Sequence, residues 1–168
     1  AVVALDREFS MWCGEHDGVL TIRHPETQAI LASFPQCSLT KSYVWSILQD
    51  CDHVWVGMSS GRLRVYSASS RQLKFERIRH AGGIYSLVAC GRFVYSASND
   101  FTIREWDRST AQHTTRVLAE HTNQVRCLCV CAGYLISGGD DGAIHVWDVS
   151  TTIRTMCFQQ RESVLALA

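Results

Sequence analysis

Polar and apolar positions alternate along four segments of the chain that recur at nearly constant spacing. The segments are DGVLTIRH (17–24), SGRLRVYS (60–67), DFTIREWD (100–107) and DGAIHVWD (141–148), which align without gaps at steps of 43, 40 and 41 residues. Each begins with a two-residue turn signal and continues with apolar side chains at alternate positions, the pattern of a hairpin's second strand. Because a fixed period of roughly 20 to 50 residues is typical of repeat architectures, we predict four copies of one unit.

Three further strands are predicted in each unit. The runs MWCGEH, VWVGMS, VYSASN and LISGGD supply the first strand of each hairpin, and QAILASF, RQLKFERI, HTTRVL and IRTMCF supply the last strand of each unit. Another strand pattern lies upstream of each hairpin, at 2–5, 44–47, 84–87, 125–128 and 164–167. Its third position is always small: Ala4, Ser46, Ser86, Cys127 and Ala166. We expect a neighbouring backbone to approach closely at this small position.

The repeat predicts an all-β protein of four-stranded antiparallel units. The predicted boundaries are 1–39, 40–80, 81–121 and 122–161, and 162–168 is predicted to begin a fifth unit with its first strand. No helix is expected, because no segment holds a 3.6-residue apolar period over about eleven or more residues. The chain starts and stops inside apolar runs, which favours a segment of a longer chain.

Four-stranded units with a WD dipeptide, here at 106–107 and 147–148, resemble the WD-repeat (WD40-type) β-propeller family. The resemblance covers essentially the whole chain. It is specific in the third and fourth units, fair in the second and degenerate in the first. It implies a partial β-propeller of about four antiparallel blades, with the rest of a ring of roughly seven blades in the same longer chain.

A serine, a histidine and two further residues recur in the third and fourth units with all four identities preserved. Adding 41 to the numbers of one set produces the other: His80, Ser96, Asp100 and Trp106, then His121, Ser137, Asp141 and Trp147. A charge-relay set for catalysis is normally present once, and no G-x-S-x-G elbow is present. A structural role is therefore favoured, and the resemblance implies a hydrogen-bonded tetrad that ties three strands and a loop together.

The first two units lack this set of residues. The equivalent positions are Thr40, Val56, Ser60 and Tyr66 in the second unit and, for the last three, Cys13, Asp17 and Arg23 in the first. These units are expected to rely on packing. We predict one large apolar column along the repeats: Trp12, Trp55, Tyr95 and Ile136.

Composition and charge exclude several classes of function. The 168 residues are 46% hydrophobic, and 16 Lys and Arg balance 16 Asp and Glu, so no overall field attracts nucleic acid or an anionic membrane. No run reaches the roughly 18 apolar residues of a membrane span, so membrane insertion is not expected. The basic stretch RQLKFERIRH (71–80) is interpreted as a solvated outer strand, with a phosphate-binding site as the alternative.

Eight cysteines without framework spacing indicate reduced thiols and an intracellular protein, in the cytoplasm rather than the nucleus. Three of them lie in CLCVC (127–131). A metal site is not predicted there, because side chains at alternate strand positions are roughly 7 Å apart and no C-x-x-C or nearby histidine pair completes a ligand set. No cofactor is predicted.

The resemblance places partner binding on the face where the fourth-to-first and second-to-third loops lie. The positions it selects in this chain are Tyr43, Trp45, Gly83, Tyr85, Gln124, Arg126, His16, Ser59, Asn99 and Asp140. Aromatic and arginine side chains are enriched in interface hot spots, and Trp45, Tyr85 and Arg126 share one column.

The predicted function is a non-catalytic scaffold or adaptor that presents a rigid face to partner proteins or peptides. One alternative is a regulatory propeller attached to an enzyme domain outside this chain, since VWVGMSSGRLRVY (54–66) is similar to propeller segments that precede inositol-phosphatase domains. Another is a module that binds phosphorylated ligands or nucleic acid through the basic stretch. Nucleic acid is not expected as the main partner.

Overall fold

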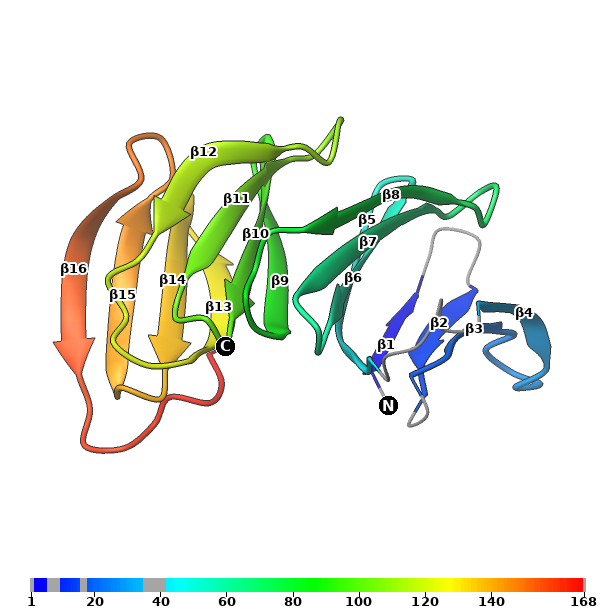
Figure 1. The fold of residues 1–168 in the computed structure, drawn as a ribbon, viewed down its shortest axis with the longest axis horizontal. Coiled ribbons are helices and arrows are strands. Elements are labelled where there is room, and N and C mark those ends of the chain that lie inside the picture. The colour runs from blue at the N-terminus through cyan, green and yellow to red at the C-terminus, as the bar shows by residue number, and fades with distance from the viewer. Residues whose placement is uncertain (1, 6–9, 16–17, 35–41, 168) are drawn as a thin grey trace.

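A computed structural model describes residues 2–5, 10–15, 18–34 and 42–167 (Figure 1). All its described regular elements are strands, grouped in four sheets. The first sheet contains β1 (Val2–Leu5), β2 (Met11–Gly14), β3 (Leu20–Arg23) and β4 (Ile30–Phe34). The second contains β5 (Val44–Asp50), β6 (His53–Met58), β7 (Arg62–Ser67) and β8 (Leu73–Ile78).

The other two sheets have the same plan. The third contains β9 (Ile84–Cys90), β10 (Phe93–Ser98), β11 (Ile103–Asp107) and β12 (His113–Leu118). The fourth contains β13 (Val125–Cys131), β14 (Tyr134–Gly139), β15 (Ala143–Asp148) and β16 (Ile153–Gln159). Each sheet is antiparallel with its strands in chain order, so we call the sheets blades 1 to 4.

The blades stand side by side in an arc (Figure 1). The first strands of neighbouring blades contact one another, β1 with β5, β5 with β9 and β9 with β13. The four predicted unit ranges each contain one blade. The all-β fold with four-stranded blades is confirmed, and the described residues contain no helix. Consequently none of them forms a helix long and apolar enough to cross a membrane.

The hydrophobic core lies between blades rather than inside them. Trp12 of blade 1 packs with Val44 and Val56 of blade 2 in one buried cluster. Trp55 of blade 2 clusters with Ile84 and Trp106 of blade 3. Each blade therefore buries its faces only against its neighbours, and the same arrangement joins Tyr95 to Val125 and Trp147.

The four residues of the predicted apolar column differ in burial. Trp12, Trp55 and Tyr95 are all fully buried, but Ile136 is only half-buried. Side chains of this column point toward the next blade. Ile136 belongs to blade 4, and the described residues contain no further blade to cover it.

The predicted close approach at the small column is confirmed. Ser46 Oγ donates to the carbonyl of Ile84 in the next blade at 3.1 Å. Ser86 Oγ accepts a bond from the backbone N of Leu128 at 3.2 Å, and Cys127 Sγ lies 3.5 Å from the carbonyl of Val164. A larger side chain at these positions would separate neighbouring inner strands.

The predicted first strand of a fifth blade is not formed as a strand, because 160–167 has no regular structure. A strand is defined by its hydrogen-bonded neighbour, and no described strand pairs with this segment. Its position still follows the repeat: a Cβ on Gly138 would lie 2.5 Å from Val164, as one on Gly57 would lie 2.7 Å from Ile84. Residue 164 thus occupies the place of a first strand's first residue.

Candidate interaction face and buried tetrads

The four predicted members of the blade 3 set are joined by hydrogen bonds. His80 Nδ1 lies 2.8 Å from Asp100 Oδ2, and His80 Nε2 lies 2.7 Å from Ser96 Oγ. Trp106 Nε1 donates to the same serine oxygen at 2.8 Å. Strands β10 and β11, their connecting turn and the loop that enters β9 are thereby tied together.

Blade 4 repeats this arrangement. His121 Nδ1 lies 2.9 Å from Asp141 Oδ2, and His121 Nε2 lies 2.8 Å from Ser137 Oγ. Trp147 Nε1 donates to Ser137 Oγ at 2.9 Å. The blade 4 tetrad also packs on His145, whose ring stacks on that of His121 with centroids 4.2 Å apart.

The aspartates of both tetrads are held as carboxylates. Burial opposes ionisation of Asp100, but hydrogen bonds from His80 and Thr102 outweigh it and lower its pKa. Burial likewise opposes ionisation of Asp141, whose pKa is lowered by the backbone N–H groups of Thr122 and Ala143 and then by His121. A carboxylate accepts the proton of histidine Nδ1, so Nε2 accepts the serine O–H, and every polar group has a partner.

This connectivity is that of a catalytic Ser-His-Asp triad, but the surroundings do not suit catalysis. Ser96 and Ser137 have no exposed surface, and each hydroxyl oxygen already accepts a tryptophan N–H. No substrate carbonyl can reach either oxygen without opening the blade interface. Both tetrads therefore have a structural role, which is to hold the strands of blades 3 and 4 together.

Blades 1 and 2 are held by different contacts. In blade 1, Arg23 stands at the tryptophan position, and its Nη2 donates to Glu15 Oε1 at 2.8 Å. In blade 2, Tyr66 packs with Phe34 and Trp12, with ring centroids 5.0 and 5.7 Å apart. Packing around Tyr66 fits the expectation for blade 2, but Tyr66 also forms a side-chain hydrogen bond with Arg64. Blade 1 adds an ion pair that the sequence pattern did not predict.

Three predicted partner-binding side chains form a continuous stack across blades 2, 3 and 4. The rings of Trp45 and Tyr85 are stacked, with centroids 4.7 Å apart and planes 5° from parallel. The guanidinium carbon of Arg126 lies 4.4 Å from the Tyr85 ring centroid. Trp45 also covers Gly83, where a Cβ would collide with the indole ring. Tyr85 is therefore enclosed between two neighbours.

Polar partners fix the arginine end of this stack. Arg126 Nε and Nη2 donate to Asp140 at 2.7 to 3.0 Å. Tyr85 Oη donates to Gln124 Oε1 at 2.8 Å. We call this set the stacked row: Trp45, Tyr85, Gln124, Arg126 and Asp140. Its members were predicted as separate contact residues, and the structure brings them together as one unit.

The remaining predicted positions lie in the loops beside the stacked row. Tyr43 is 41% exposed, and its backbone N donates to Ser59 Oγ at 2.8 Å. The backbone N of Asn99 donates to the carbonyl of Gly83 at 2.9 Å. We call this loop surface with the stacked row the interaction face. The predicted residue His16 lies outside the described residues.

The predicted positions do not include Phe101, a 42% exposed aromatic residue in the β10–β11 turn two residues after Asn99. The signal was present in the alignment of the repeats, because Gly18, Gly61 and Gly142 stand at its position in the other units. Those glycines were read only as turn residues.

The thiols of CLCVC are not assembled as a metal site. Burial raises the pKa of Cys127 to about 11 and also raises that of Cys129. Protonated thiols are poor metal ligands and poor nucleophiles. Among the described residues, no group of three or more His, Cys, Asp or Glu side chains is placed to hold a metal ion.

The basic stretch lies on β8, the outer strand of blade 2, and its charge is partly balanced locally. Lys74 Nζ is 3.2 Å from Asp52 Oδ2, and Glu76 accepts from Arg62 and Arg64 at 2.7 and 2.6 Å. His80, at its end, belongs to the tetrad. The Glu76 bonds go to arginines outside the stretch, so the alternative of a phosphate or nucleic-acid site stays a prediction.

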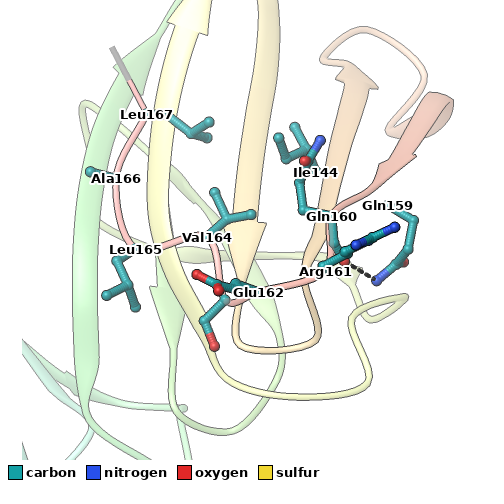
Figure 2. A pocket seen from close by; sticks show the side chains of 10 residues that line it. Ile144, Gln159, Gln160, Arg161, Glu162, Val164, Leu165, Ala166 and Leu167 are labelled. Carbon is teal, nitrogen blue, oxygen red and sulfur yellow. Dashed lines mark hydrogen bonds between the residues drawn. The ribbon is translucent and has the colours of Figure 1, made fainter.

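A cavity of about 750 Å³ lies beside blade 4, lined by Ile144 and residues 159–167 (Figure 2). Val164, Leu165 and Leu167 contribute apolar side chains, and Arg161 and Glu162 line its other part. It lies against the outer side of the last blade, where Met156 and Phe158 are also more than half exposed. No tetrad residue lines this cavity.

Comparison with known proteins identifies the repeat. The family model for the WD domain, G-beta repeat, matches residues 71–107 and 112–148, which contain both tetrads. Cell division control protein 4 of Saccharomyces cerevisiae is 28% identical over 99 residues, which are 56% of this chain and 13% of that protein.

Solved structures share the fold at low identity. A chain in the crystal structure of the Mitotic Checkpoint Complex superposes with a TM-score of 0.86 at 19% identity, covering 99% of this chain and 52% of that one. The crystal structure of RRP9 WD40 repeats gives 0.82 at 17% identity, covering 94% and 50%. The chain thus spans about half of each solved chain. Proteins built on this repeat generally bind other proteins and are generally non-catalytic modules.

Proposed function

We propose that this chain, a WD-repeat β-propeller segment of four blades, acts as a non-catalytic scaffold that binds partner proteins through its interaction face. The observation that carries the proposal is the stacked row, in which Trp45, Tyr85 and Arg126 from three successive blades contact one another in series. Tryptophan, tyrosine and arginine are the residue types most enriched in interface hot spots.

Preorganisation explains why such a row favours binding. Ordering a mobile side chain at an interface costs roughly 0.5 to 1.5 kcal/mol. Here Trp45 is held by Tyr85 and Gly83, and Arg126 is held by Asp140, before any partner arrives. The buried tetrads stiffen the turns on which the neighbouring loops depend. These side chains are therefore already ordered in the free protein, and binding a partner loses little further conformational entropy.

We further propose that additional blades of the same longer chain cover the outer side of blade 4. Half-buried Ile136 and more than half-exposed Met156 and Phe158 lie on this blade, and the chain spans about half of each solved relative. The full coding sequence tests this directly: it should encode further four-stranded repeats next to these. It would also reveal whether an enzyme domain is attached.

We propose an intracellular location, in the cytoplasm rather than the nucleus. The seven described cysteines are free thiols, and Cys51, Cys131 and Cys157 are exposed. Alkylation of freshly lysed cells should modify Cys51, Cys131 and Cys157 without prior reduction. Modification only after reduction would place the protein in an oxidising compartment.

The binding proposal is tested by changing Trp45→Ala and Arg126→Ala together and recovering partners by affinity purification from cells. The matched control is Arg92→Ala with Tyr134→Ala, an arginine and an exposed tyrosine at the opposite ends of the inner strands. The first pair should remove the partners retained by the unaltered protein, and the control pair should retain them. Equal recovery with both pairs at similar melting temperatures would refute the assignment.

A further inference from the structure

Blade 2 carries a surplus of positive charge that the rest of the chain lacks. Residues 62–79 contain six basic residues and one acidic residue: Arg62, Arg64, Arg71, Lys74, Arg77, Arg79 and Glu76. Because the whole chain has 16 basic and 16 acidic residues, the remaining residues include 10 basic and 15 acidic ones. The positive charge is therefore concentrated on the hairpin of β7 and β8, whereas the remainder of the chain is acidic.

Protection of a sheet edge does not account for this charge. β8 is the last strand of its sheet, and charged side chains on such an edge discourage pairing with other chains. The other outer strands need few of them, since β4 has no charged residue, β12 has Arg116 and β16 has Arg154. Arg116 Nη1 lies 3.7 Å from Glu105 Oε2, and Arg154 Nε lies 3.0 Å from Glu120 Oε2. Among these four outer strands, only β8 combines several cations with a shortage of carboxylates.

The carboxylates near β8 are already engaged. Glu76 accepts from both Arg62 and Arg64, at 2.7 and 2.6 Å. Asp52 Oδ2 lies 3.2 Å from Lys74 Nζ. Within the part of the chain that the structure describes, no carboxylate is hydrogen-bonded or ion-paired to the remaining arginines of the hairpin: Arg71, Arg77 and Arg79. These three positive charges are available to a ligand.

Two of these arginines are spaced along the end of β8. Arg77 is fixed by two contacts: its guanidinium carbon lies 5.4 Å from the Phe75 ring centroid, and its Nη1 donates to the carbonyl of Glu76 at 2.9 Å. Arg79 is exposed at the next alternate position, just after the strand ends at Ile78. Alternate side chains of an extended chain are roughly 7 Å apart. Arg77 and Arg79 therefore present two separate charges rather than one converging pair.

The other side of β8 limits the pattern of charge that a ligand can carry. Glu76 lies there, opposite Arg64 in the strand register, and would repel a second acidic group. An extended peptide along the free edge of β8 also points alternate side chains to opposite sides. Acidic residues are therefore favourable only at every second position, on the side of Arg77 and Arg79.

The length and spacing of the charged surface favour a peptide over other anions. The six residues of β8 span roughly 20 Å, and the rest of the chain is acidic. A nucleic acid gains most from a long basic surface, because it carries charge along its whole length. A phosphorylated side chain concentrates nearly two negative charges on one group, which suits converging arginines. Single carboxylates at intervals match Arg77 and Arg79 better.

We infer that the outer rim of blade 2 is a docking site for an extended protein segment with Asp or Glu at alternate positions. We call its contact residues the rim strip: Phe75, Arg77 and Arg79. Carboxylates of the segment pair with the two arginines, and its aliphatic carbons pack on the Phe75 ring. None of these residues belongs to the stacked row. The inference therefore goes beyond the proposed function, because it adds a second contact surface and names the chemistry of its ligand.

The test titrates the full-length protein into a fluorescein-labelled peptide of roughly eight residues, which is long enough to cover the rim strip. Glutamate alternates with threonine in the test peptide, and glutamine replaces glutamate in the control peptide. Fluorescence anisotropy should show binding of the glutamate peptide only. Its affinity should fall several-fold when the ionic strength is raised from about 0.05 to about 0.5 M, because salt screens exposed ion pairs.

Arg79→Glu and Arg161→Glu form a matched pair of variants with the same change in net charge. Arg79 lies in the loop after β8, and Arg161 lies in the loop after β16. Both are exposed, and neither side chain has a hydrogen-bond or ion-pair partner among the described residues, so both variants should keep the melting temperature of the unaltered protein. Arg79→Glu should weaken binding of the glutamate peptide roughly fivefold or more, and Arg161→Glu less than about twofold.

Several results would overturn the inference: equal affinity for the glutamate and glutamine peptides, no binding of either, or equal losses in Arg79→Glu and Arg161→Glu. A peptide with phosphoserine in place of glutamate, or an oligouridylate of similar length, would also overturn it by binding about tenfold tighter than the glutamate peptide.

Trp45→Ala with Arg126→Ala separates this inference from the scaffold proposal. That variant should bind the glutamate peptide as the unaltered protein does, and a loss of binding would move the peptide to the interaction face and contradict a separate rim strip. Recovery of partners from cells with the same variant tests the scaffold proposal independently, so either proposal can fail while the other stands.

Discussion

Blades 1 and 2 and blades 3 and 4 share a backbone plan, but their strands are fastened by different chemistry. In blades 3 and 4 a buried serine accepts an indole N–H and bonds to a histidine that is anchored by an aspartate. In blade 2 the tryptophan position is occupied by Tyr66, whose ring packs on Trp12 and Phe34 of blade 1. In blade 1 it is an arginine bonded to a glutamate. The same blade can therefore be held by a closed polar network or by packing.

The difference explains why the repeat is obvious in one half and degenerate in the other. A buried polar network works only when every member has its partner, so it requires four identities at fixed spacing. Packing requires only apolar volume of suitable shape, and many side chains provide that. Loss of a residue should consequently have different effects in the two halves.

The largest effect is expected for Tyr66→Ala in blade 2. Removing a buried ring from the Trp12, Phe34 and Tyr66 cluster should cost roughly 3 to 5 kcal/mol of unfolding free energy. Tyr66→Phe keeps the ring and should cost far less, which denaturant titration of both variants would measure. If Tyr66→Phe cost as much as Tyr66→Ala, blade 2 would depend on a polar bond and the comparison would collapse.

Ser96→Ala in blade 3 should have the next largest effect although it removes a single oxygen atom. It leaves Trp106 Nε1 and His80 Nε2 buried without their partner, at roughly 1 to 3 kcal/mol for each orphaned group. Ser137→Ala should do the same in blade 4, whereas Ser60→Ala in blade 2 breaks one hydroxyl pair with Ser42 and should cost about 1 kcal/mol. The melting temperatures of these three variants would test the predicted order of effects.

Combining Ser96→Ala with Trp106→Phe sharpens this result. Compared with Ser96→Ala alone, the double variant has one fewer buried polar group without a partner. Its loss of unfolding free energy should therefore be smaller than the sum of the losses in the two single variants. Strict additivity would show that the tetrad is not an energetic unit.

A smaller, pH-dependent effect should distinguish blade 4 from blade 3. Burial, then electrostatic interaction with His121 and Arg154, lowers the pKa of His145 from 6.5 to about 4. The unfolded chain therefore binds the proton more readily, so the stability from neutral His145 is complete above pH 6.5 and is lost as pH falls through about 4. Between pH 7 and 5 the loss should reach about 2 kcal/mol.

Replacement of His145 identifies the source of that loss. His145→Gln should reduce the fall in melting temperature between pH 7 and 5, and His24→Gln in the β3–β4 turn should not. Blade 3 carries Arg104 at the equivalent position, and arginine does not titrate in this range. An unchanged pH dependence in His145→Gln would assign the effect to other groups.

Much of the fold was predictable because its signals are local. Alternation marks a strand within a few residues, and the turn signals placed the four hairpins in register, as β10–β11 and β14–β15 show. The tetrads were predictable for the same reason, since Ser137 and Trp147 recur 41 residues after Ser96 and Trp106. The small position of the inner strands also predicted the contact of Ser46 with Ile84.

Other features depended on contacts that no repeat encodes. Ile136 was predicted to share an apolar column with Trp12, Trp55 and Tyr95, yet its burial depends on a neighbour that the described residues do not include. The strand predicted at 164–167 lacks a pairing partner for the same reason.

The amino-acid sequence by itself determined the all-β repeat, the order of the strands within each blade and the membership of the two tetrads, because each depends on spacing along the chain. Only the tertiary structure decided that Trp45, Tyr85 and Arg126 stack into one row fixed by Asp140. Those residues are about 40 positions apart in sequence, and they meet only because neighbouring blades bring their inner strands into contact.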